Sequence, residues 1–511
     1  ISIDGEWRAV EGSRYYGTPC LYKENGFKER KDAEALIAWL WERENGSENS
    51  GVMQSEVSDA GKANAGLMGV YNTSQGTILK VEKKKETKNP PLLYNLAELQ
   101  NDCSKMFKIS PDQTLKVVQE LYERKLVTYP RTDARVLSTA VAKEISKNIG
   151  GLTHYEPLAA FASEAMQAGL WKNIAKMRYV NDKQITDHYA IIPTGQGLGA
   201  LRSLPELNRK IYQVIVRRFL SIFYPAAVYQ KYAVEIEVKG EHFFAGFKVL
   251  KEAGYLKVAE IPKKKKDTAG ESVGRTNRLE PGIDGNDAEN PAREADGTDS
   301  SQPKVIDASH PEFIQMLEQL KKGMKVSLDD LQIKEGETSP PKRYSSGSMI
   351  LAMENAGQLI EDEELRAQIK GSGIGTSATR AEILKKLFNI KYMALNEKTQ
   401  VITPTYLGEL IYEVVHTSMK QLLNPELTAS WEKGLTYVAE GSITPDEYMQ
   451  KLERFVIGRT YNAVHMGNTY GLRPAFDAVA VFYQNAGKEK KLNFKKGNDH
   501  EKRRNENHRI I

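Results

Sequence analysis

Residues 110–133, SPDQTLKVVQELYERKLVTYPRTD, carry the strongest structural and chemical signals of the chain. Ser110 stands before Pro111, and Gln113 follows three residues after the serine. This is the pattern of a capped helix start with proline in the first turn. We therefore predict a helix that ends near Arg124, followed by extended chain, because the proline of the Tyr-Pro pair disfavours helical backbone before it. The apolar face of this helix recurs at helical spacing and consists of Leu115, Val118, Leu121 and Tyr122.

Tyr129 and Arg131 are the candidate catalytic pair of this stretch. A neutral phenol is a weak nucleophile, and a nearby guanidinium stabilises both a phenolate and the charge that develops on a phosphate. In extended chain, side chains two residues apart emerge on the same side. Taken alone, the pair also fits a partly buried tyrosine beside a surface arginine.

A second candidate segment is TDHYAIIPT, residues 186–194, in which His188 follows Asp187. A protonated imidazole is suited to binding phosphate. The same residues also fit a histidine at a strand end that is hydrogen-bonded locally.

A third candidate segment is GSGIGTSATR, residues 371–380, where a glycine-rich loop leads into a helix. Backbone N–H groups at a helix N-terminus bind phosphate. Arg380 is expected in the first turn, where the helix dipole disfavours a cation, so we predict an anion close to it. A plain loop before a helix is the alternative.

Composition narrows the class of protein. The chain has 511 residues, of which 40% are hydrophobic and 27% charged, as in ordinary globular proteins of several domains. No apolar run is long enough to span a membrane. Two cysteines, Cys20 and Cys103, exclude a disulfide framework and predict a reducing, cytoplasmic location.

Two segments are predicted to lack a core. Residues 263–305 have almost no large apolar side chains and are expected to form a disordered linker. Residues 488–509 hold nine basic and four acidic side chains, so this tail carries the whole net charge of +5. The tail is either a flexible arm for a polyanion or a solvated segment without a partner.

A weak internal repeat relates residues 114–127 to residues 380–393. Each segment has an apolar pair, a Leu-aromatic pair and a lysine before two further apolar positions. The pattern predicts two helices that each lead into strand-like chain, as in winged helix-turn-helix modules. Two unrelated amphipathic helices are the alternative.

Some chemistries have no support in the sequence. It contains no Gly-x-x-x-x-Gly-Lys-Ser/Thr loop for nucleotide hydrolysis and no Asp-x-Asp pair for magnesium. The eight histidines include no pair at metal-binding spacing. We therefore expect no metal ligands within this chain.

Taken together, the motifs resemble type IA DNA topoisomerases, most closely the bacterial topoisomerase III branch. The likeness is collinear over roughly residues 90–460. One departure is Tyr189, where the family usually has a second histidine. The six similar segments, in order, are PLLYNLAELQ (91–100), LVTYPRTD (126–133), DHYAIIPT (187–194), PPKRYS (340–345), GIGTSATR (373–380) and LTASWE (427–432).

The resemblance implies a role for each matching residue. Tyr129 would attack single-stranded DNA and form a 5′-phosphotyrosyl link, with Arg131 stabilising the tyrosyl oxygen and the scissile phosphate. His188 would contact phosphate near the cut. Thr379, Arg380 and Arg343 would hold the strand. The covalent link stores the phosphodiester energy, so that relaxation or decatenation would need no ATP.

The resemblance also implies parts that this sequence does not contain. The family begins with a Toprim domain, which supplies a catalytic glutamate, a lysine and the acidic residues that bind Mg²⁺. We therefore expect the chain to be a fragment that is inactive alone, with Mg²⁺ as the implied cofactor. A helicase or single-strand-binding protein is the expected partner, and the chain is expected to be a monomer.

The implied fold is α+β and mainly helical, a toroid with an antiparallel β gate and winged-helix domains. The expected divisions are residues 1–95 and 215–335 for the gate, 96–214 for the tyrosine domain, 336–470 for a helical DNA-binding domain and 471–511 for the basic tail.

Two alternative functions are weighed against this one. A non-catalytic remnant that binds single-stranded DNA would keep the fold and lack the chemistry. A conjugative relaxase or a tyrosine recombinase has less support, because a relaxase metal site of the His-x-His type is absent and Tyr129 lies early in the chain.

Overall fold

A computed structural model describes residues 3–23, 25–41, 74–259, 304–306, 311–328, 330–337, 340–359, 363, 373–466 and 471–483. Within these ranges no helix combines the length and the apolar character that crossing a bilayer requires. The described residues form an α+β fold in which helices predominate, as predicted.

The chain divides into two compact units. The structure describes parts of three segments in each, so each unit is assembled from segments that are distant in sequence. Unit 1 comprises Ile1–Pro90, Pro225–Lys257 and Ala292–Pro341, and unit 2 comprises Pro91–Tyr224, Val258–Pro291 and Lys342–Ile511.

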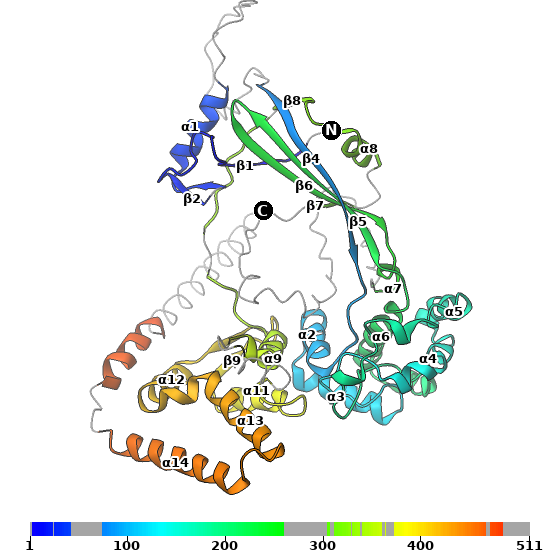
Figure 1. Cartoon of the computed structure of the whole chain (residues 1–511), viewed down its shortest axis with the longest axis vertical. Coiled ribbons are helices and arrows are strands. Elements are labelled where there is room, and N and C mark those ends of the chain that lie inside the picture. Colours follow the sequence, from blue (N-terminus) through cyan, green and yellow to red (C-terminus); the bar gives the residue numbers. More distant parts are fainter. Residues whose placement is uncertain are drawn as a thin grey trace, which may run out of the picture. The chain divides into compact units, whose positions relative to one another are not determined.

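Unit 1 is built on a six-stranded sheet (Figure 1). The strand order is β1-β6-β5-β4-β8, all antiparallel, and β7 adds to β6 in parallel. The strands are β1 (Glu6–Arg8), β4 (Ser74–Lys88), β5 (Ala227–Val238), β6 (Glu241–Glu252), β7 (Lys304–Ile306) and β8 (Lys325–Leu328). The unit also contains β2 (Leu21–Lys23), β3 (Gly26–Phe27), α1 (Arg30–Trp41) and α8 (Pro311–Gln319), and α7 (Leu256–Ala259) lies at its boundary with unit 2.

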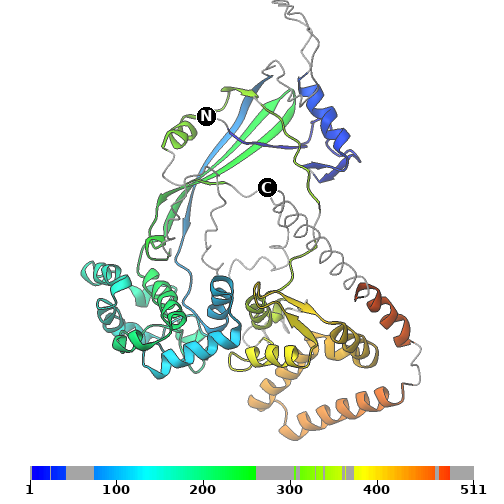
Figure 2. The same ribbon diagram turned by 180° about the vertical axis from the view of Figure 1, so that it is seen from behind.

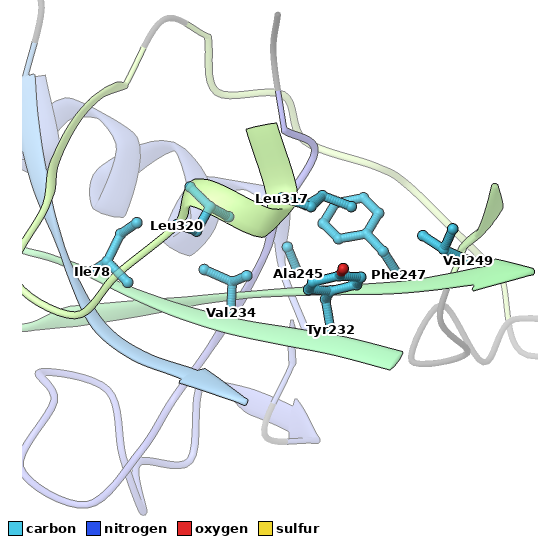
Figure 3. Packing of buried hydrophobic residues seen from close by; sticks show 8 residues of the cluster. All are labelled: Ile78, Tyr232, Val234, Ala245, Phe247, Val249, Leu317 and Leu320. Carbon is cyan, nitrogen blue, oxygen red and sulfur yellow. The ribbon is translucent and has the colours of Figure 1, made fainter. Parts of the chain in front are cut away.

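Alternation along the long strands creates the core of unit 1. Buried and half-buried side chains alternate along β6 from Glu241 to Leu250, because successive side chains point to opposite faces. Helix α8 covers one face, where Leu317 and the neighbouring Leu320 contact the sheet (Figure 3). The sheet side chains of this cluster are Ile78, Tyr232, Val234, Ala245, Phe247 and Val249.

The first part of unit 2 is helical and carries the tyrosine motif. Its α3 begins with the predicted capping box, in which the Ser110 side chain accepts from the N–H of Gln113 and the Gln113 side chain accepts from the N–H of Ser110. The helices are α2 (Leu96–Phe107), α3 (Pro111–Glu123), α4 (Thr139–Leu152), α5 (Ala159–Gln167) and α6 (Glu206–Ser221). Short 3₁₀ segments are Glu156–Leu158, Ile174–Lys176, Asp182–Gln184 and Leu198–Ser203.

The second part of unit 2 packs on the first through α2, α9 and α11. Ala97 of α2 joins Ile350 and Met353 of α9 and Leu384 of α11 in one buried cluster. The two parts therefore belong to one unit rather than to separate domains. The elements of this part, seen from behind in Figure 2, are α9 (Ser346–Glu354), a 3₁₀ turn (Ala356–Leu359), α11 (Arg380–Asn389), β9 (Met393–Leu395), β10 (Ile402–Pro404), α12 (Tyr406–Met419), a 3₁₀ turn (Lys420–Leu423), α13 (Pro425–Ala439) and α14 (Pro445–Val464).

The internal repeat is confirmed in the backbone. Lys125 and Lys391 follow their helices with positive φ angles of 59° and 60°. The hydroxyls of Thr194 and Thr405 each donate to the carbonyl oxygen of the corresponding lysine at 2.5 Å. In the second copy β9 and β10 form the wing-like hairpin, whereas in the first copy Val127 forms an isolated bridge with a residue from the distant second motif.

Three predicted boundaries need correction. The gate boundary at residue 215 falls inside α6, whose buried residues belong to unit 2. The predicted linker 263–305 lies outside the described residues up to 303, but Lys304 and Val305 belong to β7 and pair with β6. Residues 472–483, assigned to the tail, are helical, and the Tyr483 hydroxyl donates to Glu409 at 2.8 Å. The basic residues 488–509 lie outside the described part of the chain.

Candidate active site around Tyr129

Tyr129 lies directly against His188, so the first and second motifs meet although 59 residues separate them. The two ring centroids are 4.3 Å apart at an interplanar angle of 42°. Tyr122 of α3 also packs against the Tyr129 ring, in an edge arrangement with the centroids 5.5 Å apart. His188 is exposed and Tyr129 is half-buried, which leaves both side chains open to a ligand.

The two motifs are held together by backbone and hydroxyl contacts. Thr128 Oγ1 donates to the carbonyl of Ala190 at 3.0 Å and accepts from the N–H of Ile192 at 2.9 Å. Thr132 Oγ1 donates to the His188 carbonyl at 2.9 Å. These bonds fix the backbone on both sides of Tyr129, so the tyrosine and the histidine keep their relative positions.

A surface cleft of about 610 Å³ opens beside this pair. It contains one lysine, one glutamate and several hydroxyl groups, and the rings of Tyr129 and its neighbours suit a ligand that presents bases for stacking. Its lining comprises Tyr122, Glu123, Lys125, Val127, Thr128, Tyr129, His188, Tyr189, Thr194 and Gln196.

Arg131 and Arg343, two further predicted residues, have exposed side chains. The chain turns at Arg131, because the N–H of Thr132 bonds to the carbonyl of Pro130 at 3.0 Å. Arg343 precedes α9 in the segment whose Tyr344 carbonyl accepts from the N–H of Ile402. Both guanidinium groups are therefore accessible to a phosphate.

Thr379 ends the glycine-rich loop, and its side chain is exposed. Its Oγ1 accepts from the N–H of Thr376 at 2.9 Å, which closes the turn before α11. Gly373 and Gly375 have φ angles of 61° and 67°, a conformation that glycine adopts without steric cost. A Cβ on Gly373 would also lie 2.5 Å from the carbonyl oxygens of Met353 and Glu354.

Arg380 was predicted to contact DNA, but in the structure its side chain is buried inside the protein. It is the first residue of α11, and the predicted anion is present, but this anion is a carboxylate of the protein itself. Arg380 Nη1 lies 2.8 Å from Asp133 Oδ1, and the arginine is only 2% exposed. A direct bond to phosphate is therefore not its role in this conformation, since α11 and the loop enclose the guanidinium.

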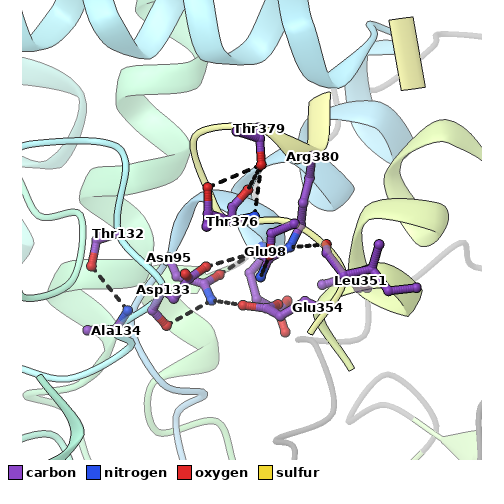
Figure 4. Close-up of polar contacts among 12 residues, drawn as sticks. Asn95, Glu98, Thr132, Asp133, Ala134, Leu351, Glu354, Thr376, Thr379 and Arg380 are labelled. Atoms are coloured by element: carbon purple, nitrogen blue, oxygen red, sulfur yellow. Dashed lines mark hydrogen bonds and ion pairs between the residues drawn. The ribbon is translucent and has the colours of Figure 1, made fainter. Parts of the chain in front are cut away.

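A polar network beneath the motif was not predicted from the sequence. Asn95 Nδ2 donates to the Asp133 carbonyl at 3.1 Å and to Glu354 Oε1 at 2.7 Å (Figure 4). Asn95 also caps α2 by accepting from the N–H of Glu98. Of this network, the sequence offers only the capping pattern of Asn95 and Glu98, because Asp133 and Glu354 come from distant segments.

Glu354 has an unusual proton affinity within this network. Burial raises its pKa from the ordinary 4.5 to about 7, and the carboxylates of Asp133 and Glu98 act in the same direction. The guanidinium groups of Arg380 and Arg135 act in the opposite direction but do not cancel the effect of burial. The folded chain therefore holds this proton more tightly than the unfolded chain does.

Replacing Glu354 with Gln should remove a pH dependence of stability. The contribution of Glu354 to the free energy of unfolding is full below pH 4.5 and is lost as the pH rises through about 7. A shift of this size corresponds to roughly 3 kcal/mol. Because Gln keeps the acceptor for Asn95, we expect Glu354→Gln to be more stable than the parent above about pH 8 by 2 to 3 kcal/mol, with little difference near pH 5.

Urea unfolding of both proteins at the two pH values measures this difference. Glu453→Gln, which removes an exposed carboxylate from α14, is the matched control and should show no such pH-dependent gain. A difference between Glu354→Gln and the parent that is independent of pH would contradict the prediction.

The magnesium that the family resemblance implies has no fitting site in the described residues. No three acidic, histidine or cysteine side chains there come together as a metal site requires. Glu98, Asp133 and Glu354 are instead engaged by arginines and an amide. No catalytic step is therefore derived through a metal.

Comparisons with known proteins identify one family for most of the chain. The chain matches the family described as DNA topoisomerase over residues 27–289 and 300–450. It is 32% identical to DNA topoisomerase 3 of Bacillus licheniformis over 393 residues, which are 76% of this chain and 47% of that relative. It is 31% identical to DNA topoisomerase 3 of Bacillus subtilis over 385 residues, which are 75% of this chain and 46% of that relative.

The chain thus spans about half the length of the curated relatives it matches. Among solved structures, it is similar to full-length topoisomerase I from Thermotoga maritima, with a TM-score of 0.48 and 19% identity. That alignment covers 75% of this chain and 52% of the other.

Proposed function

The chain belongs to the type IA DNA topoisomerase family, and on that premise we propose that it supplies the nucleophile for ATP-independent cleavage of single-stranded DNA. The hydroxyl oxygen of Tyr129 attacks a phosphodiester, loses its proton and forms a 5′-phosphotyrosyl bond, while the bond to the 3′ oxygen breaks and that oxygen takes up a proton, so that the number of protons is unchanged. Attack by the 3′-hydroxyl reverses both changes after a strand has passed through the break. Relaxation or decatenation of DNA is the outcome.

The observation that carries the proposal is the contact between Tyr129 and His188 beside an open cleft. A nucleophile for DNA must be accessible and must have groups nearby that accept the phosphate. The half-buried ring, the exposed imidazole and Lys125 in the lining meet both requirements. No energy source is needed, because the phosphotyrosyl bond conserves the energy of the phosphodiester.

The exposed cations and hydroxyls around the cleft take the supporting roles. Arg131 stabilises the charge on the attacked phosphate, and His188 binds a phosphate next to it. Thr379, at the start of α11, and Arg343, before α9, hold the DNA strand. Magnesium dependence is proposed from family membership alone, and we propose that a Toprim domain of the kind the family has provides the ligands.

Single-stranded DNA is the proposed substrate, and a cytoplasmic location follows from that substrate. A helicase or a single-strand-binding protein is a further proposed partner, because the family acts on strands that have been separated. We propose that the chain binds DNA as a monomer.

The test is trapping of a covalent adduct between the 511-residue chain and a labelled single-stranded oligonucleotide. With a Toprim domain and Mg²⁺ supplied, we expect label that resists denaturing electrophoresis and carries a free 3′-hydroxyl on the released fragment. Without these additions, we expect reversible binding that weakens with salt, since phosphate contacts release counterions. Affinity for a blunt duplex of the same length should be at least about fivefold lower, because stacking on exposed rings needs unpaired bases.

The two outcomes separate the enzyme from a binding module. Salt-dependent binding without any adduct in the complemented reaction would favour a non-catalytic remnant that binds single-stranded DNA. Equal affinity for single strands and duplex, together with the absence of an adduct, would contradict both functions.

A further inference from the structure

Arg380 connects the glycine-rich loop to the tyrosine segment through one buried side chain. Its Nε donates to the carbonyl of Ile374 and its Nη2 to the carbonyl of Gly375, each at 3.2 Å. Its Nη1 donates to Asp133 Oδ1 at 2.8 Å. The guanidinium therefore holds the loop that ends in Thr379 and, at the same time, a residue four positions after Tyr129.

Asp133 is fixed at its backbone as well as at its carboxylate. Its carbonyl accepts from Asn95 Nδ2, and the preceding Thr132 bonds through its hydroxyl to the His188 carbonyl. The Thr132 carbonyl accepts from the N–H of Leu96 at the start of α2. A displacement of Asp133 is thus passed directly to the backbone that carries Tyr129 and His188.

The two partners of the ion pair differ in exposure. The Arg380 side chain is 2% exposed and the Asp133 side chain is 39% exposed. An ion pair with one buried partner is seldom a large source of stability, because desolvation of that partner offsets the attraction, but removing Asp133 leaves the buried charge of Arg380 uncompensated. The pair is therefore better explained by the geometry that it enforces than by the stability that it adds.

We propose that Arg380 and Asp133 form a positioning pair that sets the place of the Thr379 loop relative to Tyr129. A strand held by the loop then presents its phosphodiester to the nucleophile at the correct point. The expected effect on DNA cleavage rests on the proposed function. The coupling between the loop and the tyrosine segment rests only on the contacts described above.

Adduct formation in the complemented reaction tests the effect on cleavage. Asp133→Asn and Arg380→Gln should each lower the rate at saturating oligonucleotide by about ten- to a hundredfold, as expected for a nucleophile displaced by a fraction of an ångström to an ångström. Affinity for the oligonucleotide should stay within about threefold of the parent, because Arg380 is buried and Asp133 is a carboxylate, which does not attract phosphate. The double variant should be no slower than the slower single variant, since both remove one contact.

Arg380→Lys tests whether positioning or charge matters. Lysine keeps a cation near Asp133 but loses the planar fork that also holds two carbonyls, so we expect a rate between those of the parent and Arg380→Gln. Lys451→Gln, which breaks an exposed ion pair with Glu447 on α14, is the matched control and should form adduct at the parent rate. Parent-like rates in Asp133→Asn and Arg380→Gln, or losses of rate and affinity in equal proportion, would overturn the proposal.

Hydrogen–deuterium exchange keeps the coupling testable if the parent forms no adduct. In Arg380→Gln we expect faster exchange in peptides covering residues 373–380 and also in those covering residues 127–134. Exchange should be unchanged in α14, which would show that the variant is folded. Faster exchange in the loop alone would overturn the coupling, whereas a missing adduct with coupled exchange would reject only the proposed function.

Discussion

The variant Tyr129→Phe should form no covalent adduct with DNA, a loss of about a thousandfold or more relative to the parent. Phenylalanine lacks the oxygen that bonds to phosphorus, so neither His188 nor Arg131 can compensate. The ring contacts with Tyr122 at 5.5 Å and His188 at 4.3 Å should remain. Among the described residues the Tyr129 hydroxyl makes no hydrogen bond, so the free energy of unfolding should change by less than about 0.5 kcal/mol.

The measurement is denaturing electrophoresis of the complemented reaction, with affinity for the oligonucleotide determined in parallel. Affinity should stay within about twofold of the parent, because stacking does not need the hydroxyl. Tyr122→Phe makes the same change on the neighbouring ring and should still form adduct. An adduct that survives in Tyr129→Phe would overturn the assignment of the nucleophile.

The variant Arg218→Met should lower the free energy of unfolding of unit 2 by about 3 to 5 kcal/mol, the cost of breaking a buried ion pair. Arg218 lies on α6, and its Nη2 is 3.0 Å from Asp102 Oδ2 on α2. Its Nη1 donates to the Leu92 carbonyl at 3.0 Å, and its guanidinium lies 4.0 Å from the centroid of the Tyr94 ring. Methionine fills much of the space but removes the cationic partner of Asp102, which keeps the hydrogen bond from the Tyr94 hydroxyl at 2.6 Å, and removes the arginine donor to the Leu92 carbonyl.

Urea unfolding followed by circular dichroism gives this free energy. Arg209→Met changes an exposed arginine on the same helix and should stay within about 0.5 kcal/mol of the parent. Arg218→Lys should fall between the two, because it keeps the charge but cannot reach both acceptors in a plane. A loss below about 1 kcal/mol in Arg218→Met would contradict the role of the pair.

Local sequence signals predicted parts of the fold. The start of α3 follows from Ser110, Pro111 and Gln113, because the capping groups and the N–H groups they satisfy lie within one turn. The repeat was readable for the same reason, and its two helices end in the same backbone conformation at Lys125 and Lys391. By contrast, β4 was not predicted, because its run of lysines conceals the alternation of a strand.

The candidate site was predicted as separate motifs rather than as an arrangement. Tyr129, His188 and Thr379 were each identified, and the structure shows the first two in contact. Arg380 was expected to meet an anion because of its place in α11, and it does. The sequence did not reveal that this anion is Asp133, which lies 247 positions away in the chain. A cation in the first turn of a helix needs an anion nearby, and either a carboxylate or a phosphate meets that need.

The sequence by itself determined the family, the capped helices and the choice of candidate reactive side chains, since these depend on residue type and on neighbours within a few positions. Tertiary structure alone decided which segments meet. Packing of Ala97 against Ile350, Met353 and Leu384 brings the tyrosine segment to the glycine-rich loop. Burial of Glu354 at the end of α9 likewise raises its pKa. Such effects arise from desolvation and contact between distant segments, which no local pattern of residues encodes.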